Sequence, residues 1–349
     1  MRRVPAFILS AAVWVATAVS NPSQAGSESA ITQSPAATAE VPLADHHVHV
    51  FSPAVGHWLD TELNLAPLPP FGVRELMAVL DRDHVTRAAV LSNAYFFGHD
   101  TAKQSHDESL LKTENDRVAE YIAQYPDRLV GFFGIDPLAD SAFDEIERCA
   151  RRKVFDGLKL HLANSAVDLR NPAHVQRLRE VFRRANHLGL AIVIHMRTLR
   201  ADYGREDARI FIDKVLSAAP DVPVQIAHLA GWGGYDAATD DALSAFIERA
   251  SKIGGGKDRV YFDLSAVVRG VGRNAEGSAT KAGAPDWWPE KRYVRLAERL
   301  RALGLRHVLF GTDWPDWTAR SYAADIEKNL PLSADELRVL LTNRAPWLR

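Results

Sequence analysis

Short apolar segments recur along the chain from about residue 41 onward. Their apolar residues are continuous rather than alternating, which is typical of parallel strands covered by helices. Each segment is short enough for a strand and is followed by a longer, more polar stretch. The predicted strands are residues 42–49, 87–92, 129–135, 157–162, 191–195, 222–228, 260–264 and 307–310.

The stretches between these strands have helical patterns of apolar residues. Two helix starts also carry capping signals. Asn171 and Pro172 fit an N-cap followed by proline at the first helical position. Ser333 and Glu336 have the capping-box spacing, so a last helix is expected to start at Ser333. The other predicted helices are residues 73–83, 114–125, 142–152, 173–188, 207–218, 241–252 and 293–303.

Eight strands that alternate with helices over roughly 300 residues predict a (β/α)8 TIM barrel. The competing architecture is an open, doubly wound sheet, but no glycine-rich phosphate-binding motif follows the first strand. Three connections are long, and we expect them to cover the mouth of the barrel, where long loops usually carry function. These connections are residues 52–71, 95–112 and 265–288.

The N-terminus differs from the rest of the chain. Arg2 and Arg3 precede an apolar stretch, and small residues follow near Ala25. This layout is typical of a secretory signal peptide. The apolar stretch is shorter than the about 20 residues that a membrane-spanning helix needs. The alternative is an uncleaved N-terminal anchor. The expected organisation is a signal peptide over residues 1–25, a flexible linker over residues 26–40 and one barrel domain over residues 41–349.

Composition and charge limit the kinds of molecule that the protein is expected to bind. The chain is 47% hydrophobic and 25% charged, which is ordinary for a globular protein. A formal net charge of -2 gives no basic field for nucleic acid. We therefore expect the substrate to be a small molecule, which can carry a carboxylate. From the N-terminal signal pattern we expect the protein to be exported, either to the periplasm or out of the cell. No membrane span is expected after signal cleavage, and a homodimer is left open.

The first predicted strand ends in the sequence Asp45-His46-His47-Val48-His49. Residues two apart on a strand point to the same face, so His47 and His49 should project together, with Asp45 as a supporting residue. Two neighbouring neutral imidazoles are unusual in a core but suit a borderline-soft divalent metal. His46 is expected to face the other way and to be structural.

Three later strands lead to polar residues that a buried strand does not require, namely His195, His228 and Asp313. The carboxyl ends of TIM-barrel strands converge on the active site. One such histidine alone is better explained as a core histidine with satisfied hydrogen bonds. A His-x-His pair, two more histidines and an aspartate together indicate a metal-dependent active site.

These motifs resemble those of the amidohydrolase-related family, which includes aminocarboxymuconate semialdehyde decarboxylase-like enzymes and several lactone hydrolases. The resemblance spans the barrel from about residue 43 to 347 and is specific for the superfamily but not for a substrate. It rests on the first-strand motif, His195, His228-Leu229-Ala230-Gly231, Phe310-Gly311-Thr312-Asp313-Trp314-Pro315 and Asn343-Arg344-Ala345-Pro346-Trp347.

The resemblance implies a ligand set for one divalent metal ion per chain, with zinc favoured. His228 would be the acid/base beside a metal-bound water; the alternative makes Asp313 the base, outside the metal's own ligands. Three or four protein ligands with one open position are what a catalytic zinc requires. Such a metal lowers the pKa of water, and a neighbouring imidazole can take the proton. The implied ligands are His47, His49, His195 and Asp313.

Four further residues are candidates for contacts with the substrate. Lys159 and His161 share one face of the fourth strand. The decarboxylase-like branch generally uses one metal, so Lys159 is expected to be unmodified and to hold a substrate anion or pair with an acid. For His161, a role in the active site and a purely structural role are weighed equally. Arg197 can clamp a carboxylate with two hydrogen bonds or form a surface ion pair.

Tryptophans near the later motifs offer a wall for a planar substrate. Trp314 is the chosen candidate, with Trp232 and Trp317 close to it in the motifs. Core packing is the competing explanation for each of them.

Three functions compete. The favoured one is a metal-dependent hydrolase in which metal-activated water attacks a lactone, ester or amide carbonyl. The alternative is a nonoxidative decarboxylase with the same metal and histidine. A third is a catalytically silent exported metal-binding protein, which the full set of catalytic positions disfavours.

Overall fold

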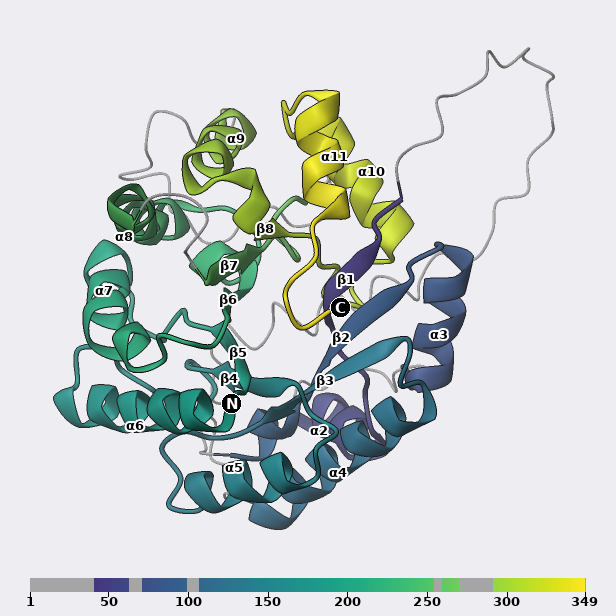
Figure 1. Cartoon of the computed structure of the whole chain (residues 1–349), viewed down its shortest axis with the longest axis vertical. Helices are drawn as coiled ribbons and strands as arrows, with labels where there is room; N and C mark the ends of the chain where they lie inside the picture. Colours follow the sequence, from purple (N-terminus) through teal and green to yellow (C-terminus); the bar gives the residue numbers. More distant parts are fainter. Residues whose placement is uncertain (1–40, 63–70, 99–106, 254–258, 270–290, 349) are drawn as a thin grey trace.

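The computed structural model places strands and helices in alternation along the chain. Eight parallel strands form one sheet in the order β1 to β8 (Figure 1). The strands lie in the middle of the molecule, and helices surround them. The predicted (β/α)8 barrel is therefore confirmed, while the predicted signal peptide and linker lie outside the described residues. The structure describes residues 41–62, 71–98, 107–253, 259–269 and 291–348.

All eight predicted strands are present, with small differences at their ends. β6 is shorter than predicted because the backbone leaves the extended region just after it. The strands are β1 Ala44–Val48, β2 Arg87–Leu91, β3 Leu129–Gly134, β4 Gly157–His161, β5 Ala191–His195, β6 Val224–Ile226, β7 Val260–Asp263 and β8 Val308–Leu309.

Backbone hydrogen bonds between β1 and the segment after β8 close the barrel. The Asp313 N–H donates to the His47 carbonyl at 2.8 Å, and the His49 N–H donates to the Trp314 carbonyl at 2.8 Å. These bonds lie at the carboxyl ends of both strands. The closure therefore brings the His-x-His motif beside Asp313, although the two are far apart in the sequence.

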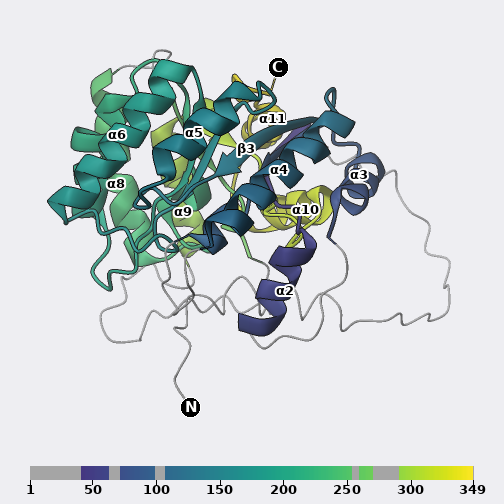
Figure 2. The ribbon, with the colours of Figure 1, turned by 90° about the horizontal axis from the view of Figure 1, so that it is seen from below.

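The helices agree with the predicted pattern, apart from two that were missed. The segment predicted as a long loop after β1 contains α2, and a second missed helix, α10, follows the β8 motif. Figure 2 shows α2 extending from one end of the barrel. The helices are α2 Pro53–Glu62, α3 Val73–Arg82, α4 Glu108–Gln124, α5 Ala142–Arg151, α6 Pro172–Leu188, α7 Arg205–Ile210, α8 Ala237–Ile253, α9 Arg292–Leu303, α10 Ala319–Asn329 and α11 Ala334–Thr342.

Side-chain caps fix several helix starts. The Asn171 side chain accepts from the Ala173 N–H, and Ser333 accepts from the Glu336 N–H, as both capping signals predicted. α4 begins earlier than expected because the Asp107 side chain accepts from Leu110 N–H and caps the helix there. No helix in the described ranges has the length and apolar character needed to cross a membrane.

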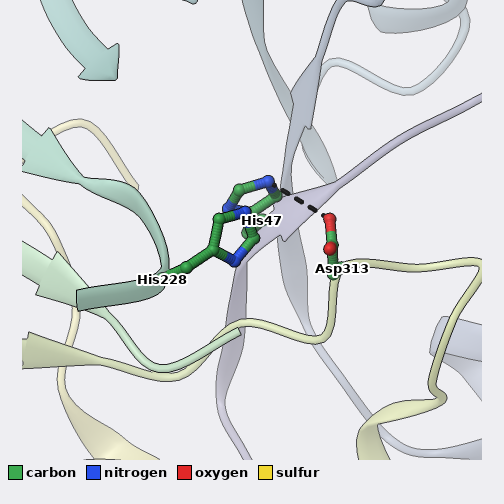
Figure 3. A group of neighbouring side chains, drawn as sticks. All are labelled: His47, His228 and Asp313. Atoms are coloured by element: carbon green, nitrogen blue, oxygen red, sulfur yellow. Dashed lines mark ion pairs between the residues drawn. The ribbon is translucent and has the colours of Figure 1, made fainter. Parts of the chain in front are cut away.

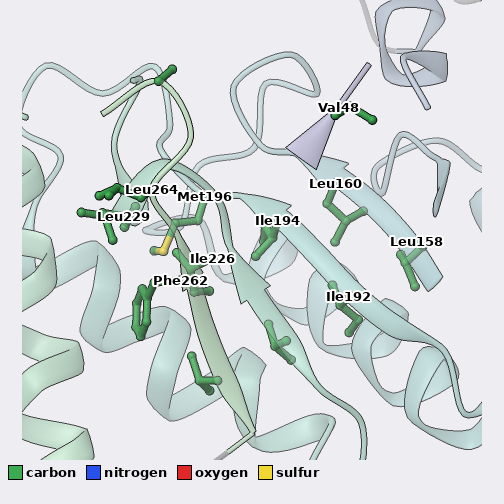
Figure 4. Close-up of a cluster of buried hydrophobic side chains, with 14 of the residues drawn as sticks. Val48, Leu158, Leu160, Ile192, Ile194, Met196, Ile226, Leu229, Phe262 and Leu264 are labelled. Atoms are coloured by element: carbon green, nitrogen blue, oxygen red, sulfur yellow. The ribbon is translucent and has the colours of Figure 1, made fainter. Parts of the chain in front are cut away.

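The strands separate two apolar layers. Leu158, Leu160, Ile192 and Ile194 belong to the larger layer, which also contains helix residues (Figure 4). The alternate strand positions form a second cluster inside the barrel, to which Trp347 from beyond α11 contributes. This inner cluster fills the barrel below the carboxyl ends of the strands, so the polar residues of the candidate site lie above an apolar floor.

Candidate metal centre and active site

The His-x-His pair of β1 converges as predicted. A β-bulge between Asp45 and Val48 interrupts the strand alternation, yet the Nε2 atoms of His47 and His49 lie 3.2 Å apart. Both residues are buried. The β-strand therefore presents two imidazole nitrogens to one point inside the barrel.

Hydrogen bonds at the other ring nitrogens set the tautomer of both histidines. His47 Nδ1 lies 3.0 Å from an Asp263 carboxylate oxygen, and His49 Nδ1 lies 2.8 Å from the Leu91 carbonyl. Both partners can only accept, so each Nδ1 carries the proton and each Nε2 carries a lone pair. Burial lowers the pKa of His49 to about 3, which keeps its ring neutral.

Asp313 brings a carboxylate to the same point. Its Oδ1 lies 3.3 Å from His47 Nε2 and 3.5 Å from His49 Nε2. Its backbone has a φ of 58°, a left-handed conformation that is uncommon for a residue other than glycine and is often found at functional sites. Gly311 precedes it, where a Cβ would lie 2.9 Å from His47 Cβ, so the glycine allows this close approach.

This set of atoms fits a divalent cation. Two imidazole lone pairs and one carboxylate oxygen face one another within 3.5 Å, which is electrostatically unfavourable without a positive charge between them. Burial raises the pKa of Asp313, but the positive charge that His47, His228, His49 and Lys159 carry when protonated lowers it overall, so this place favours an ionised carboxylate beside a cation. Nitrogen and carboxylate ligands of this kind suit zinc or a similar metal.

His228 stands beside this group (Figure 3). Ligand atoms of His47, His228 and Asp313 all lie within 4.8 Å of one another. The Nδ1 of His228 donates to the Ser265 carbonyl at 2.8 Å, which leaves a lone pair on Nε2. Burial lowers the pKa of His228. A neutral imidazole with a free lone pair is what a general base requires.

The backbone at His228 departs from ordinary strand geometry. His228, Leu229 and Ala230 have φ values of 51°, 53° and 67°, all in the left-handed region. The His228 N–H is held by an Asp263 carboxylate oxygen at 2.9 Å. The cost of this conformation is offset by the surrounding contacts, a pattern common at active sites.

His195, the predicted third histidine ligand, lies next to this group rather than within the tightest part of it. Its ring stacks on His161 at 3.9 Å and meets the His228 ring edge-on at 5.2 Å. Its Nδ1 is buried and has no hydrogen-bond partner among the described residues. Burial holds the pKa of His161 and His195 well below the ordinary value. A buried nitrogen without a partner is unusual and is consistent with a ligand role.

Lys159 is buried inside the barrel at the same place. Its Nζ lies 3.4 Å from His47 Nε2. Burial lowers the pKa of Lys159 to about 8, and Asp263 and Asp313 partly offset that effect. The described residues provide no carboxylate within ion-pair distance of this amine, so simple pairing with an acid is not observed.

The predicted substrate role of Arg197 is not favoured by the structure. Arg197 Nη1 donates to both carboxylate oxygens of Asp236, at 2.9 and 2.8 Å. Asp236 also accepts from the Thr239 N–H at the start of α8. Arg197 therefore joins the end of β5 to α8 through an ion pair, as in the second predicted alternative, although this pair is largely buried rather than on the surface.

Replacing Arg197 with alanine is expected to lower the free energy of unfolding by about 1–3 kcal/mol, because Asp236 loses a charged hydrogen-bond partner. Urea denaturation followed by circular dichroism measures this. Changing Asp236 to asparagine as well keeps an acceptor for the helix start, so the double variant should lose less than the two single changes added together. An unchanged midpoint in Arg197→Ala would contradict the structural role.

The predicted wall of tryptophans needs correction. Trp314 is buried and meets the Phe71 ring edge-on at 5.7 Å, and Trp317 is buried against Tyr322. Both are packing residues. Trp232 is only half-buried and its ring lies 5.0 Å from the His195 ring, so among the described residues it is a tryptophan beside the site.

The two remaining residues of the first motif are structural. His46 donates from Nδ1 to the Phe310 carbonyl and accepts the Ala345 N–H at Nε2, which confirms its predicted role. Asp45 accepts from the Thr312 N–H at 3.0 Å and from the Thr312 hydroxyl at 2.6 Å. It supports the site by fixing the residue before Asp313 and makes no bond to an imidazole.

Asp263, at the end of β7, is a site residue that the sequence analysis missed. It is fully buried and accepts from His47 Nδ1, from the His228 N–H and from the side chains of Gln225 and Ser265. Burial raises the pKa of Asp263, but attraction and hydrogen bonding from His47 outweigh it, so the pKa is lowered. The available signal was a polar residue ending a buried strand, as in β5.

Comparison with known proteins agrees with this geometry. The family model that matches the chain is that of the amidohydrolases, and it covers residues 44–343. No curated protein sequence matches the chain.

Solved structures that share the fold include the following three. A probable 2-pyrone-4,6-dicarboxylic acid hydrolase from Acinetobacter baumannii has 17% identity and a TM-score of 0.54, with 86% of this chain and 96% of that chain covered. The 5-carboxyvanillate decarboxylase of Sphingomonas paucimobilis has 16% identity and a TM-score of 0.56, with coverage of 86% and 97%. An amidohydrolase from Burkholderia multivorans with bound zinc has 15% identity and a TM-score of 0.55, with coverage of 86% and 96%.

At these low sequence identities, the solved structures support the fold alone. The match to the family model is stronger evidence, because it extends over nearly the whole described barrel. The resemblance inferred from the strand-end motifs is confirmed. The chain therefore belongs to the amidohydrolase family.

Proposed function

We propose that the protein is a metal-dependent hydrolase that attacks a lactone, ester or amide carbonyl with water. One observation carries the proposal: the unprotonated Nε2 atoms of His47 and His49 and the Asp313 carboxylate converge beside His228. We further propose one zinc ion per chain. The neighbour with bound zinc and the nitrogen-rich donor set support that choice.

A divalent metal in this place would polarise a carbonyl oxygen and lower the pKa of water toward neutrality. The residues of the chain supply the rest. His47, His49 and Asp313 hold the metal, with His195 beside them. His228 Nε2 accepts a proton and can return it to the leaving group, while its Nδ1–H stays bonded to the Ser265 carbonyl.

His161 is the best-placed neutral donor for a substrate. The Asn164 N–H donates to its Nδ1 at 3.2 Å, so the neutral ring carries its proton on Nε2. The side chain is only partly buried, between Tyr95 and His195. It can therefore offer a hydrogen bond to a substrate oxygen without adding charge.

Arg197 gives decarboxylation no added support. Its guanidinium was the candidate clamp for a substrate carboxylate, and its Nη1 already donates to Asp236. Lys159 keeps decarboxylation as the second candidate, because its buried amine lies 3.4 Å from His47 Nε2. The structural neighbours include a hydrolase and a decarboxylase and do not separate the two reactions.

Turnover in ¹⁸O-labelled water, with carbon dioxide monitored at the same time, separates these reactions. The purified protein, reconstituted with zinc, is assayed on a panel of lactones, esters and aromatic carboxylic acids. Hydrolysis is expected to place label in a product carboxylate without gas release, because water attacks the carbonyl. Carbon dioxide in a one-to-one ratio with product would identify a lyase and overturn the proposal.

We also propose where the protein acts and what kind of partner it binds. The charged and apolar pattern before residue 26 supports export to the periplasm or out of the cell. A small molecule, rather than nucleic acid, is the proposed partner, and a homodimer is compatible with it.

A further inference from the structure

Asp263 joins the two halves of the candidate site through four of the five hydrogen bonds that its carboxylate accepts; the fifth comes from the nearby Ser265 N–H at 3.2 Å. Its Oδ2 accepts from His47 Nδ1 at 3.0 Å and from Gln225 Nε2 at 2.6 Å. Its Oδ1 accepts from the His228 N–H at 2.9 Å and from the Ser265 hydroxyl at 2.5 Å. One carboxylate thus contacts the ring of a metal-ligand candidate and the backbone of the base candidate.

We propose that Asp263 is a positioning residue that keeps His47 in the Nδ1-protonated tautomer, with its Nε2 lone pair directed at the metal, while it anchors the left-handed backbone of His228. The inference rests on the metal centre of the proposed function, but not on the reaction catalysed there. Partners of this kind orient metal-bound histidines in general and fix which nitrogen is free.

The alternative tautomer is disfavoured by every neighbour of His47 Nδ1. The Ser265 hydroxyl lies 3.1 Å from this nitrogen, but its proton is given to Asp263, so its oxygen can only accept there. Both neighbours of the nitrogen therefore require an N–H. A neutral His47 with its proton on Nε2 would leave a lone pair facing these two acceptors.

Asparagine at position 263 would reverse this preference while changing almost no volume. Its single oxygen should occupy the Oδ1 place, because the backbone N–H of His228 cannot become an acceptor. Its amide NH₂ then occupies the Oδ2 place and faces His47 Nδ1. His47 must accept there, which moves its proton to Nε2, the atom that the metal needs.

Gln225 cannot readily relieve this conflict. Its Nε2 donates to Asp263 and also to the His46 carbonyl at 3.1 Å. Turning the amide over would place its oxygen against that carbonyl. In Asp263→Asn the contact between the two amide NH₂ groups therefore remains and should lower stability, whereas His47 can answer the change by moving its proton to Nε2.

The tautomer can be measured directly. Long-range ¹H–¹⁵N spectra of ¹⁵N-histidine-labelled, metal-free protein at about pH 9, well above the pKa of an ordinary imidazole, distinguish Nδ1–H from Nε2–H, and a His47→Gln variant assigns the signal. We expect Nδ1–H in the wild type and Nε2–H in Asp263→Asn. Zinc affinity, measured by competition with a chelator, should fall by about 10–100-fold in this variant.

Asp45→Asn is the matched control. Asp45 is also buried and also touches residue 47, but only its backbone N–H, at 3.2 Å. An asparagine amide there would face the Thr312 hydroxyl, which can accept. This variant should keep the Nδ1–H tautomer of His47 and the wild-type zinc affinity.

Two results would overturn the inference. One is an Nε2–H tautomer of His47 in the wild-type protein, which decides the question even if the variant does not fold. The other is a folded Asp263→Asn protein with wild-type zinc affinity. Failure of the wild type to bind zinc would instead count against the proposed function, while the tautomer, measured without metal, would still test the inference.

Discussion

Replacing His228 with asparagine is expected to lower kcat by roughly 10²–10⁴-fold, the usual range for loss of a general acid or base. The metal content should remain at the wild-type level. Asparagine suits this position for two reasons. Its side-chain amide can replace the donor that His228 offers to the Ser265 carbonyl, and it tolerates the left-handed backbone better than alanine does.

The test compares the turnover number of each variant with the amount of metal that the variant binds. Activity is measured on the substrate found with the panel, and bound metal is measured on the same preparation. His228→Ala serves as a second variant, which lacks any donor or acceptor. If either variant lost the metal together with the activity, His228 would be a ligand, and Asp313 would become the candidate for proton transfer.

Removing the two imidazoles of the His-x-His pair should have an equally large effect on the metal itself. The wild type is expected to bind about one equivalent of zinc, and His47→Ala and His49→Ala should each lose most of it. Each change removes one of three donors that lie within 3.5 Å of one another. The measurement is elemental analysis after dialysis, supported by the shift of the unfolding midpoint on addition of zinc.

His46→Gln controls for damage to β1. His46 lies in the same motif and is buried, but the hydrogen bonds of its ring go to backbone groups of Phe310 and Ala345. This variant should lose stability and keep its metal. Full metal occupancy in a His47→Ala, His49→Ala double variant would show that the metal binds elsewhere.

Sequence reasoning singled out the residues of the candidate metal centre because they follow apolar strands. His47, His195 and Asp313 stand out as polar residues at strand ends, and a barrel brings such ends together. The same reasoning applies to Asp263, but that aspartate lies inside the predicted strand of residues 260–264, directly after Tyr261 and Phe262, and so did not stand out as a residue at a strand end. Its four partners come from three strands and become visible only in three dimensions.

Arg197 and Trp314 show the limit of proximity in sequence. Each lies within two residues of a motif histidine or aspartate, yet Arg197 binds Asp236 and Trp314 packs on Phe71. Which side chain meets the open end of a barrel depends on loops from other strands. The missed helix α2 has a similar cause, since Pro53 and Gly56 suggest a loop, although proline is well tolerated at a helix start.

The hydrogen bond between His46 and Ala345 joins residues 299 positions apart. It ties the His-x-His strand, made early in synthesis, to a segment made after the last helix, and the same segment supplies Trp347 to the barrel floor. Contacts of such long range form slowly, because the chain between them must first be ordered. One edge of β1 can pair with β2 soon after both are made, but its other edge closes only when the segment after β8 is in place. His47 and Asp313 therefore meet only once the barrel is closed.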